Sequence, residues 1–159
     1  MIRQIPGLRL SNPVHLLAFG FGSGTLARAP GTWGTVAALP LYGLLQGLPL
    51  SPYLVVVLIL AVLGIWLCGR TARDLGVHDH PGIVWDEIVG YLITMIAAPS
   101  GWGWWLLGFV LFRLFDILKP WPIRVIDRGV EGGLGIMLDD VLAGLMALAC
   151  LQFVAWLWL

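Results

Sequence analysis

Charged residues divide the chain into alternating apolar and polar stretches. The stretches Ala29–Gly69, Ile88–Phe112 and Val141–Leu159 contain no Asp, Glu, Lys or Arg. The charged residues fall into three blocks, one before each of these stretches. Long segments without charge are typical of helices that lie in a membrane.

Proline and glycine punctuation divides the apolar stretches into five expected helices. Their approximate bounds are Gly34–Leu48, Tyr53–Cys68, Ile83–Ala98, Gly103–Leu118 and Leu138–Leu159. Several are shorter than the ~20 residues that cross a bilayer comfortably. The segment Gly34–Leu48 is the weakest, because it is short and contains Pro40, and a re-entrant or tilted element is an alternative to a full crossing. We expect an all-α integral membrane protein, a compact bundle of about four or five hydrophobic helices forming one domain over 1–159.

The positions of the charges predict how these helices are oriented. If all five cross the membrane, the start of the chain and the loops 70–82 and 119–134 share one face. The two short uncharged turns then lie on the other face. All nine Lys and Arg residues lie on the first face, which the positive-inside rule makes cytoplasmic. We therefore expect a polar site at the cytoplasmic interface.

Composition agrees with a membrane protein. The 159 residues are 59% hydrophobic and only 11% charged, whereas soluble domains are ~25% charged. The mean hydropathy is +0.91. The formal net charge of zero gives no basic surface for nucleic acid, so no such partner is expected. The pattern predicts no particular oligomeric state.

Two acidic pairs stand near the starts of predicted helices. Asp86 and Glu87 lie in "IVWDEIVG", and Asp139 and Asp140 lie in "MLDDVLAG". An ionised carboxylate at the centre of a membrane helix costs ~2.5–3.5 kcal/mol by insertion scales. Like charges brought together repel unless they are protonated or bridged by a cation. Carboxylate oxygens suit Mg²⁺, so we expect a magnesium site. The alternative is that the acids pair with basic residues and anchor helix ends.

Small residues provide a way for the two acidic pairs to meet. Gly90 lies four residues after Asp86, and Gly144 four residues after Asp140, which is about one helical turn. Ala143 adds a further small residue beside Gly144. Small residues at these positions let two helices approach closely.

A basic motif lies in "FRLFDILKPWPIRVIDR". Arg113, Asp116 and Lys119 recur every three residues, so they share one face of a helix that stops before Pro120. Next to a carboxylate–metal cluster, Arg and Lys are candidates to bind phosphate oxygens. Arg128, in the same charged block, is a further candidate. The alternative is a self-satisfied ladder of ion pairs without a ligand.

Two loops are weaker candidates for substrate binding. "GFGSGTLARAPGTWG" opens a helix, where backbone N–H groups can bind an anion, and contains Thr32. A tight interfacial turn is the alternative. In "GVHDHPG", His80 and its neighbours are expected to face the substrate rather than to act in catalysis.

Taken together, these motifs resemble the bacterial phosphatidylglycerophosphatase A family. The shared pieces are "SNPVHLLAFGFGSG", "APGTWGT", "VHDHPGIVWDE", "FRLFDILKPWPI" and "DRGVEGGLGIMLDDVLAG", in the family's order. The resemblance implies Mg²⁺-dependent hydrolysis of phosphatidylglycerophosphate, a phospholipid in the membrane, to phosphatidylglycerol and phosphate. It implies a multi-pass protein of the bacterial inner membrane with its active site facing the cytoplasm. One departure is Ala27, where family members commonly have proline.

The resemblance carries roles over to individual positions. Asp86, Glu87, Asp139 and Asp140 are the expected metal ligands and catalytic acids. Asp116 joins them as a catalytic candidate, beside the basic residues of its motif. Attack on phosphorus by water is preferred, and attack by one of the acids is an alternative.

Two other classes of protein explain intramembrane acids. In a small cation transporter or channel, the acids mark an ion path. In a structural membrane subunit, they pair with basic residues of a partner. The clustering of the acids at one face argues against the first class, and a dependence on divalent cations would argue against the second.

Overall fold

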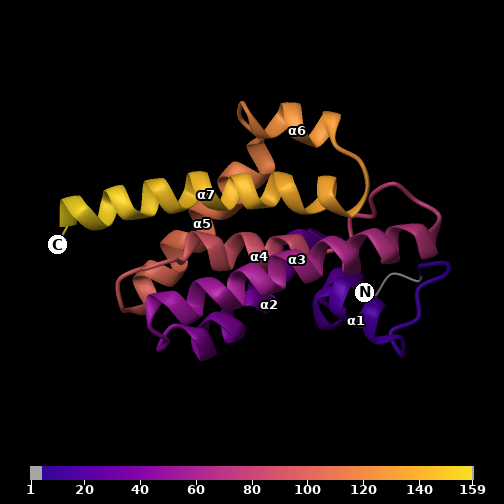
Figure 1. Cartoon of the computed structure of the whole chain (residues 1–159), viewed down its shortest axis with the longest axis horizontal. Coiled ribbons are helices and arrows are strands. Elements are labelled where there is room, and N and C mark those ends of the chain that lie inside the picture. Colours follow the sequence, from indigo (N-terminus) through magenta and orange to yellow (C-terminus); the bar gives the residue numbers. More distant parts are fainter. Residues whose placement is uncertain (1–4, 159) are drawn as a thin grey trace.

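The computed structural model describes residues 5–158, without the side chain of Arg128, and is all-helical over this range. Its elements, in chain order, are α1 (Pro13–Ala18), η1 (Gly20–Thr25), α2 (Pro30–Leu45), α3 (Leu50–Leu75), α4 (Trp85–Thr94), α5 (Trp102–Leu118), α6 (Ile123–Gly129) and α7 (Gly132–Trp158). Figure 1 shows α7 along the upper side of the molecule, with α6 standing above it and α1 at the opposite side.

The two longest helices, α3 and α7, are the candidates for crossing a membrane. They contain 26 and 27 residues, so each is about 40 Å long and exceeds the ~30 Å hydrocarbon core of a bilayer. Only 22% and 28% of their most apolar windows are buried inside the protein. Leu58, Val62 and Trp66 of α3 are each more than half exposed. Exposed apolar faces of this extent suggest a membrane protein.

Helix α4 is much shorter than its predicted segment Ile83–Ala98. It has 10 residues, which gives a length of about 15 Å, half of the hydrocarbon core. The turn after it places Ala97 at φ 52, in the left-handed region, and Pro99 follows. Both features end a helix. The predicted bounds of this helix are therefore wrong at both ends, and the helix that forms is too short to cross a bilayer by itself.

The centre of the molecule is the contact between α4 and α7. Helix α4 is surrounded by α2, α3, α5 and α7, with which it makes its contacts. All of its residues are buried except Asp86 and Glu87, which are half-buried. Tyr91 and Phe112, from α4 and α5, are among the largest fully buried side chains. The element that carries the first acidic pair is thus held by packing on all sides.

The bounds of three further helices, α2, α3 and α7, differ from the predicted ones. Helix α3 runs from Leu50 to Leu75 rather than from Tyr53 to Cys68. Helix α2 starts at Pro30 rather than Gly34, since proline fits the first position of a helix. Helix α7 starts at Gly132 rather than Leu138. A side chain at Gly133 would collide with the backbone of Ile65 and Gly69 in α3, so the glycines allow this early turn to pack. The last predicted residue of this helix, Leu159, lies outside the described range.

Helix α5 matches its prediction within one residue, and α6 is an addition. Helix α5 ends at Leu118, followed by Lys119 at φ 43 and by Pro120. The short α6 lies inside the predicted loop 119–134.

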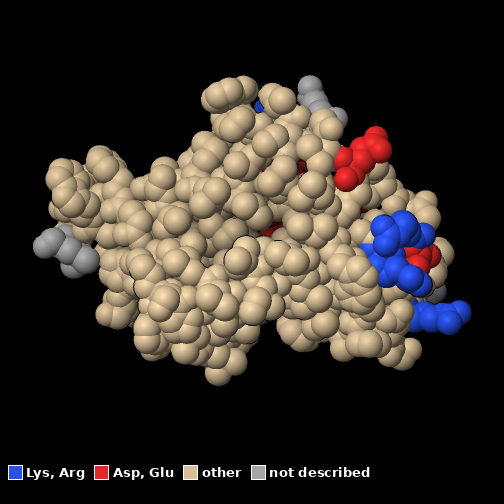
Figure 2. Space-filling view, in the orientation of Figure 1, with Lys and Arg blue, Asp and Glu red and all other residues tan. Residues whose placement is uncertain are grey.

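The exposed charges lie toward one end of the molecule. On the face drawn in Figure 2, the coloured Lys, Arg, Asp and Glu side chains gather mainly at the right-hand end, and the left half shows none. At that end, α1 is tied to α3 by His15 Nε2 and Asp74 Oδ2, 3.2 Å apart. On this face, the exposed charges therefore lie mainly at one end, and much of the remaining surface is uncharged.

Candidate active site

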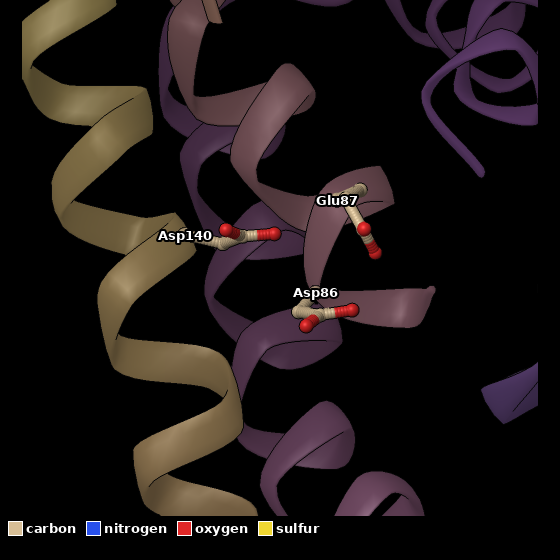
Figure 3. Close-up of side chains that lie close together, drawn as sticks. All are labelled: Asp86, Glu87 and Asp140. Atoms are coloured by element: carbon tan, nitrogen blue, oxygen red, sulfur yellow. The ribbon is translucent and has the colours of Figure 1, made fainter. Parts of the chain in front are cut away.

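Three carboxylates from two helices converge at the α4–α7 contact. Asp86 and Glu87 lie in the first turn of α4, and Asp140 lies in α7. One oxygen of each lies within 4.8 Å of the other two. Figure 3 shows Asp140 projecting from α7 toward α4, where the other two side chains stand. This arrangement brings the two predicted acidic pairs together through one member of the second pair.

Two glycines make this approach possible, as the sequence predicted. A Cβ at Gly144 of α7 would lie 2.5 Å from the carbonyl oxygen of Gly90 in α4. A Cβ at Gly90 would lie 2.9 Å from the carbonyl oxygen of Asp140. Ala143 is fully buried beside this crossing. The backbones of the two helices are therefore in direct contact one turn beyond the acids.

Arg113 lies beside the carboxylates. Its Nη1 forms an ion pair with Asp116 on the same helix and lies 3.7 Å from Oε1 of Glu87. The Arg113 side chain is only 14% exposed, so water screens these charges weakly. The prediction that Arg113, Asp116 and Lys119 share one helix face is confirmed for the first two. Lys119 is instead the first residue after the helix, at φ 43.

Lys119 connects the site to α6. Its Nζ donates to Asp139 Oδ2 at 2.7 Å and to Asp127 Oδ1 at 2.5 Å. Burial of the ammonium opposes its charged form, but the two carboxylates outweigh burial and raise the pKa of Lys119 above its usual value. Lys119 therefore stays protonated at neutral pH.

These side chains line a pocket of about 280 Å³. Its acidic lining residues are Asp79, Asp86, Glu87, Asp116, Asp139 and Asp140, and its basic ones are Arg113 and Lys119. Ala29, Pro30 and Gly31 close one side with the start of α2. A Cβ at Gly31 would collide with the Glu87 carboxylate, so α2 packs its backbone directly against the acid cluster.

The structure separates the two neighbouring aspartates. Asp140 belongs to the cluster of three acids, whereas Asp139 is bonded to Lys119. Both line the pocket. All four expected metal ligands were predicted to form one group. Among the described residues, only Asp86, Glu87 and Asp140 lie close enough together to do so.

Two other predicted substrate contacts, Thr32 and His80, are not among the described residues that line this pocket. Thr32 directly follows Gly31, which does line it. The His80 ring accepts a hydrogen bond from Gly82 N at 3.0 Å and lies 5.7 Å from the Phe19 ring, which stabilises its own loop. The side chain of Arg128 lies outside the described part of the chain.

The sequence interpretation missed Gly31 and Asp127. Gly31 stands in "APGTWGT", a motif that was noted only as a loop opening a helix. Asp127 stands in the charged block and gave no signal, because its role depends on α6 folding back toward Lys119. In the loop "GVHDHPG", Asp79 and Pro81 line the pocket, whereas His80 was the predicted contact.

Unsatisfied oxygen atoms show that the site fits a divalent cation. Asp86 Oδ1, Glu87 Oε2 and Asp140 Oδ2 are buried and have no hydrogen-bond partner within the described structure. Buried carboxylate oxygens without partners are costly. Hard cations such as Mg²⁺ take oxygen ligands from one or two carboxylates together with water and phosphate. The donor set is therefore one that suits Mg²⁺.

Comparisons with known proteins agree with these observations. The family model for phosphatidylglycerophosphatase A matches residues 16–155. A phosphatidylglycerophosphatase A from Escherichia coli K12 is 50% identical over 152 residues, covering 95% of this chain and 88% of the relative. One from Haemophilus influenzae is 52% identical over 142 residues, covering 88% and 87%.

A more distant relative has a different name. A Bacteroides thetaiotaomicron protein that is 38% identical over 152 residues, covering 89% of this chain and 92% of its own, is provisionally named a phosphatidylinositol-3-phosphatase. No solved structure matches this chain. Since the family model covers most of the chain, including both acidic pairs and the basic motif, the chain belongs to the phosphatidylglycerophosphatase A family.

Proposed function

We propose that this chain hydrolyses phosphatidylglycerophosphate to phosphatidylglycerol and inorganic phosphate, using Mg²⁺ bound by Asp86, Glu87 and Asp140. The observation that carries the proposal is the pocket in which these acids lie beside Arg113 and Lys119. Membership of the phosphatidylglycerophosphatase A family supports the same substrate. A lipid phosphate ester presents its head group at a membrane surface, which fits a pocket lined by charged side chains in a protein with exposed apolar helix faces.

Each group in the pocket has a distinct role in this proposal. Mg²⁺, when bound, would neutralise charge on the phosphate and make water a better nucleophile. Arg113 and Lys119 bind non-bridging phosphate oxygens, whose charge grows in the transition state. Asp116 holds the Arg113 guanidinium by its ion pair, so that the guanidinium faces the phosphate in a fixed orientation.

The hydrolysis requires one proton to move. Oxygen from water forms a bond to phosphorus, and the bond from phosphorus to the glycerol oxygen breaks. The water proton passes to that leaving oxygen through a carboxylate, for which we propose Asp139, because its Oδ1 is buried without a partner within the described structure. Direct attack on phosphorus by a carboxylate is the alternative, and it would leave a phosphoryl group on the enzyme.

We also propose the location of the protein. The chain lies in the bacterial inner membrane with the pocket facing the cytoplasm. The supporting observations are the two helices of sufficient length and the segregation of Lys and Arg along the sequence.

The test is release of inorganic phosphate by the purified full-length protein in detergent. Phosphatidylglycerophosphate and phosphatidate are compared as substrates, each with Mg²⁺ and with EDTA. We expect release from phosphatidylglycerophosphate that depends on Mg²⁺ and exceeds release from phosphatidate. Absence of release from folded protein would contradict the proposal and favour an ion-path or subunit role. Release that persists in EDTA would contradict only the metal assignment.

A further inference from the structure

An apolar groove lies between α2 and α5, separate from the acidic pocket. It has a volume of about 350 Å³ and is lined by Val36, Leu39, Trp102, Trp105, Leu106 and Phe109. Its lining is almost entirely apolar. Trp102 is 80% exposed and Leu106 is 56% exposed, so the groove opens to the surroundings of the protein rather than into its core.

The groove and the pocket share the same face of α5. Trp102, Leu106 and Phe109 follow one another at spacings of four and three residues, and Arg113 follows Phe109 after four more. Residues at these spacings lie on one helix face. Arg113 lines the acidic pocket. The apolar lining of the groove therefore continues directly into the basic lining of the pocket.

On α2 as well, the side that faces α5 extends from the pocket to the groove. The start of this helix lines the pocket through Gly31. Val36 and Leu39, which line the groove, lie four and seven residues after Thr32. Thr32 therefore stands on their helix face between pocket and groove. Further along, a Cβ at Gly43 would lie 3.2 Å from the Trp105 ring, which closes the far end.

The distance from the pocket to the far end of the groove matches the thickness of one leaflet of a bilayer. Arg113 and Trp102 are eleven residues apart on α5, which corresponds to about 16 Å along a helix at a rise of 1.5 Å per residue. One leaflet contributes half of the hydrocarbon core, or about 15 Å. A lipid with its phosphate in the pocket would thus place its hydrocarbon along the groove.

We propose that the groove between α2 and α5 binds an acyl chain of the lipid whose terminal phosphate enters the acidic pocket. This inference rests on the proposed function, because it assigns the substrate's chain to the same site. The substrate enters sideways from the bilayer between the two helices. Recognition is divided between the head group, bound by charges, and one hydrocarbon chain, bound by apolar contact.

The first test compares substrates of different chain length. Leu106→Trp fills the groove from its exposed side, and Leu58→Trp on α3, where Leu58 is 64% exposed and lines no described pocket, is the matched control. The measured quantity is the ratio of kcat/KM for a long-chain phosphatidylglycerophosphate to that for a soluble short-chain analogue. We expect Leu106→Trp to lower this ratio about tenfold, which corresponds to loss of one to two buried methylene-sized contacts. Leu58→Trp should leave it unchanged. An unchanged ratio for Leu106→Trp would overturn the proposal.

The second test does not depend on hydrolysis. A phosphatidylglycerophosphate with a photoreactive acyl chain is cross-linked to the wild-type protein in vesicles, and labelled residues are mapped by mass spectrometry. We expect labelling concentrated in residues 36–39 and 102–109 that is lost on competition with unlabelled phosphatidylglycerophosphate but not with diacylglycerol. Uniform labelling of all apolar helix faces, as expected for bulk lipid, would contradict the proposal that the groove binds the acyl chain. Labelling of the groove without phosphate release would instead support acyl-chain binding in the groove and contradict the proposed hydrolysis.

Discussion

Asp139 and Asp140 are neighbours in the chain, yet they have different surroundings. Asp140 faces Asp86 and Glu87 across the α4–α7 contact, and Asp139 is bonded to Lys119. Successive residues on a helix point about 100° apart, so one pair of acids can serve two roles. Substitutions at the two positions should therefore have distinguishable effects.

Replacement of Asp140 by Asn should abolish activity. The amide removes the negative charge of one of the three carboxylates of the proposed metal site and keeps only one oxygen there. We expect kcat/KM to fall more than about 100-fold, which exceeds the 10–100-fold loss that is typical when a residue bonded to a metal ligand is replaced. The measurement is phosphate release at saturating Mg²⁺. Glu131→Gln, an exposed acid outside the pocket, is the matched control and should retain activity. Wild-type turnover in the Asp140 variant would remove this residue from the mechanism.

The same substitution should remove the dependence of the melting temperature on Mg²⁺. Binding to the native state alone stabilises a protein by about 2.7 kcal/mol at a ligand concentration of 100 Kd, so the wild-type Tm should rise with Mg²⁺ and fall in EDTA. Asp140→Asn should lose this rise. In EDTA the variant should melt no lower than the wild type, because one of three mutually repelling carboxylates is gone. An equal rise in both proteins would place the metal elsewhere.

Lys119 links two carboxylates, and its loss should reduce catalysis. Lys119→Met removes a positive charge next to the proposed phosphate position, and we expect kcat to fall about 100-fold, as for removal of one charge-stabilising donor. Asp127→Asn removes only the more exposed of its two partners and should cost much less. Steady-state kinetics of both variants provide the test. Equal effects of the two substitutions would show that Lys119 acts by holding α6 rather than by binding phosphate.

At the level of helices, the site depends on how closely α4 and α7 approach. Helix α4 is too short to cross a bilayer and gains its stability from packing against four other helices. The carboxylates are held at its first turn, where negative charge also complements the helix dipole. The distance between its backbone and that of α7 sets the distance between the acids.

Replacement of Gly144 by Ala should separate these helices. The new methyl group would lie 2.5 Å from the Gly90 carbonyl oxygen, and backbone atoms cannot move aside as a flexible side chain can. We expect a loss of ~1–3 kcal/mol in the free energy of unfolding, as for other overpacked cores, together with reduced activity. Gly103→Ala is the matched control, because nothing lies within 4 Å of its added methyl group. It should leave the free energy of unfolding close to that of the wild type, because Gly103 is the second residue of α5 rather than an interior one. Unfolding in detergent, followed by circular dichroism, measures both; a tolerated Gly144→Ala would contradict the close contact.

At the level of the whole molecule, exposed charges and exposed apolar helix faces occupy different parts of the surface drawn in Figure 2. The exposed charged side chains visible in Figure 2 lie mainly toward one end. Leu58 and Val62 of α3 and Phe153 and Trp156 of α7 expose apolar surface elsewhere. A membrane accommodates such a molecule with its polar end at one interface.

This arrangement predicts opposite accessibility for two loops. In a Cys150→Ala background, where the remaining Cys68 is buried, single cysteines are placed at Gly47 and at Val77, which are exposed positions just outside the two ends of α3. A thiol reagent that does not cross membranes should label Val77→Cys in inside-out vesicles and Gly47→Cys in right-side-out vesicles. Labelling of both from the same side would contradict the proposed orientation.

The sequence by itself determined the all-helical class, the approximate positions of the long helices and seven of the eight described charged residues that line the pocket. These follow from local rules: apolar stretches without charge, proline and glycine at helix ends, and acids with a glycine one turn later. Helix α5 and its shared face of Arg113 and Asp116 needed no more than this periodicity.

Only the tertiary structure decided the true length of α4, the early start of α7 and the different contacts of Asp139 and Asp140. Each depends on contacts between residues far apart in the chain. The glycines that open α7 pack on α3, and Lys119 reaches Asp139 and Asp127 because α5, α6 and α7 meet there. Local patterns carry no information about which partner a carboxylate meets, because that choice is made by packing.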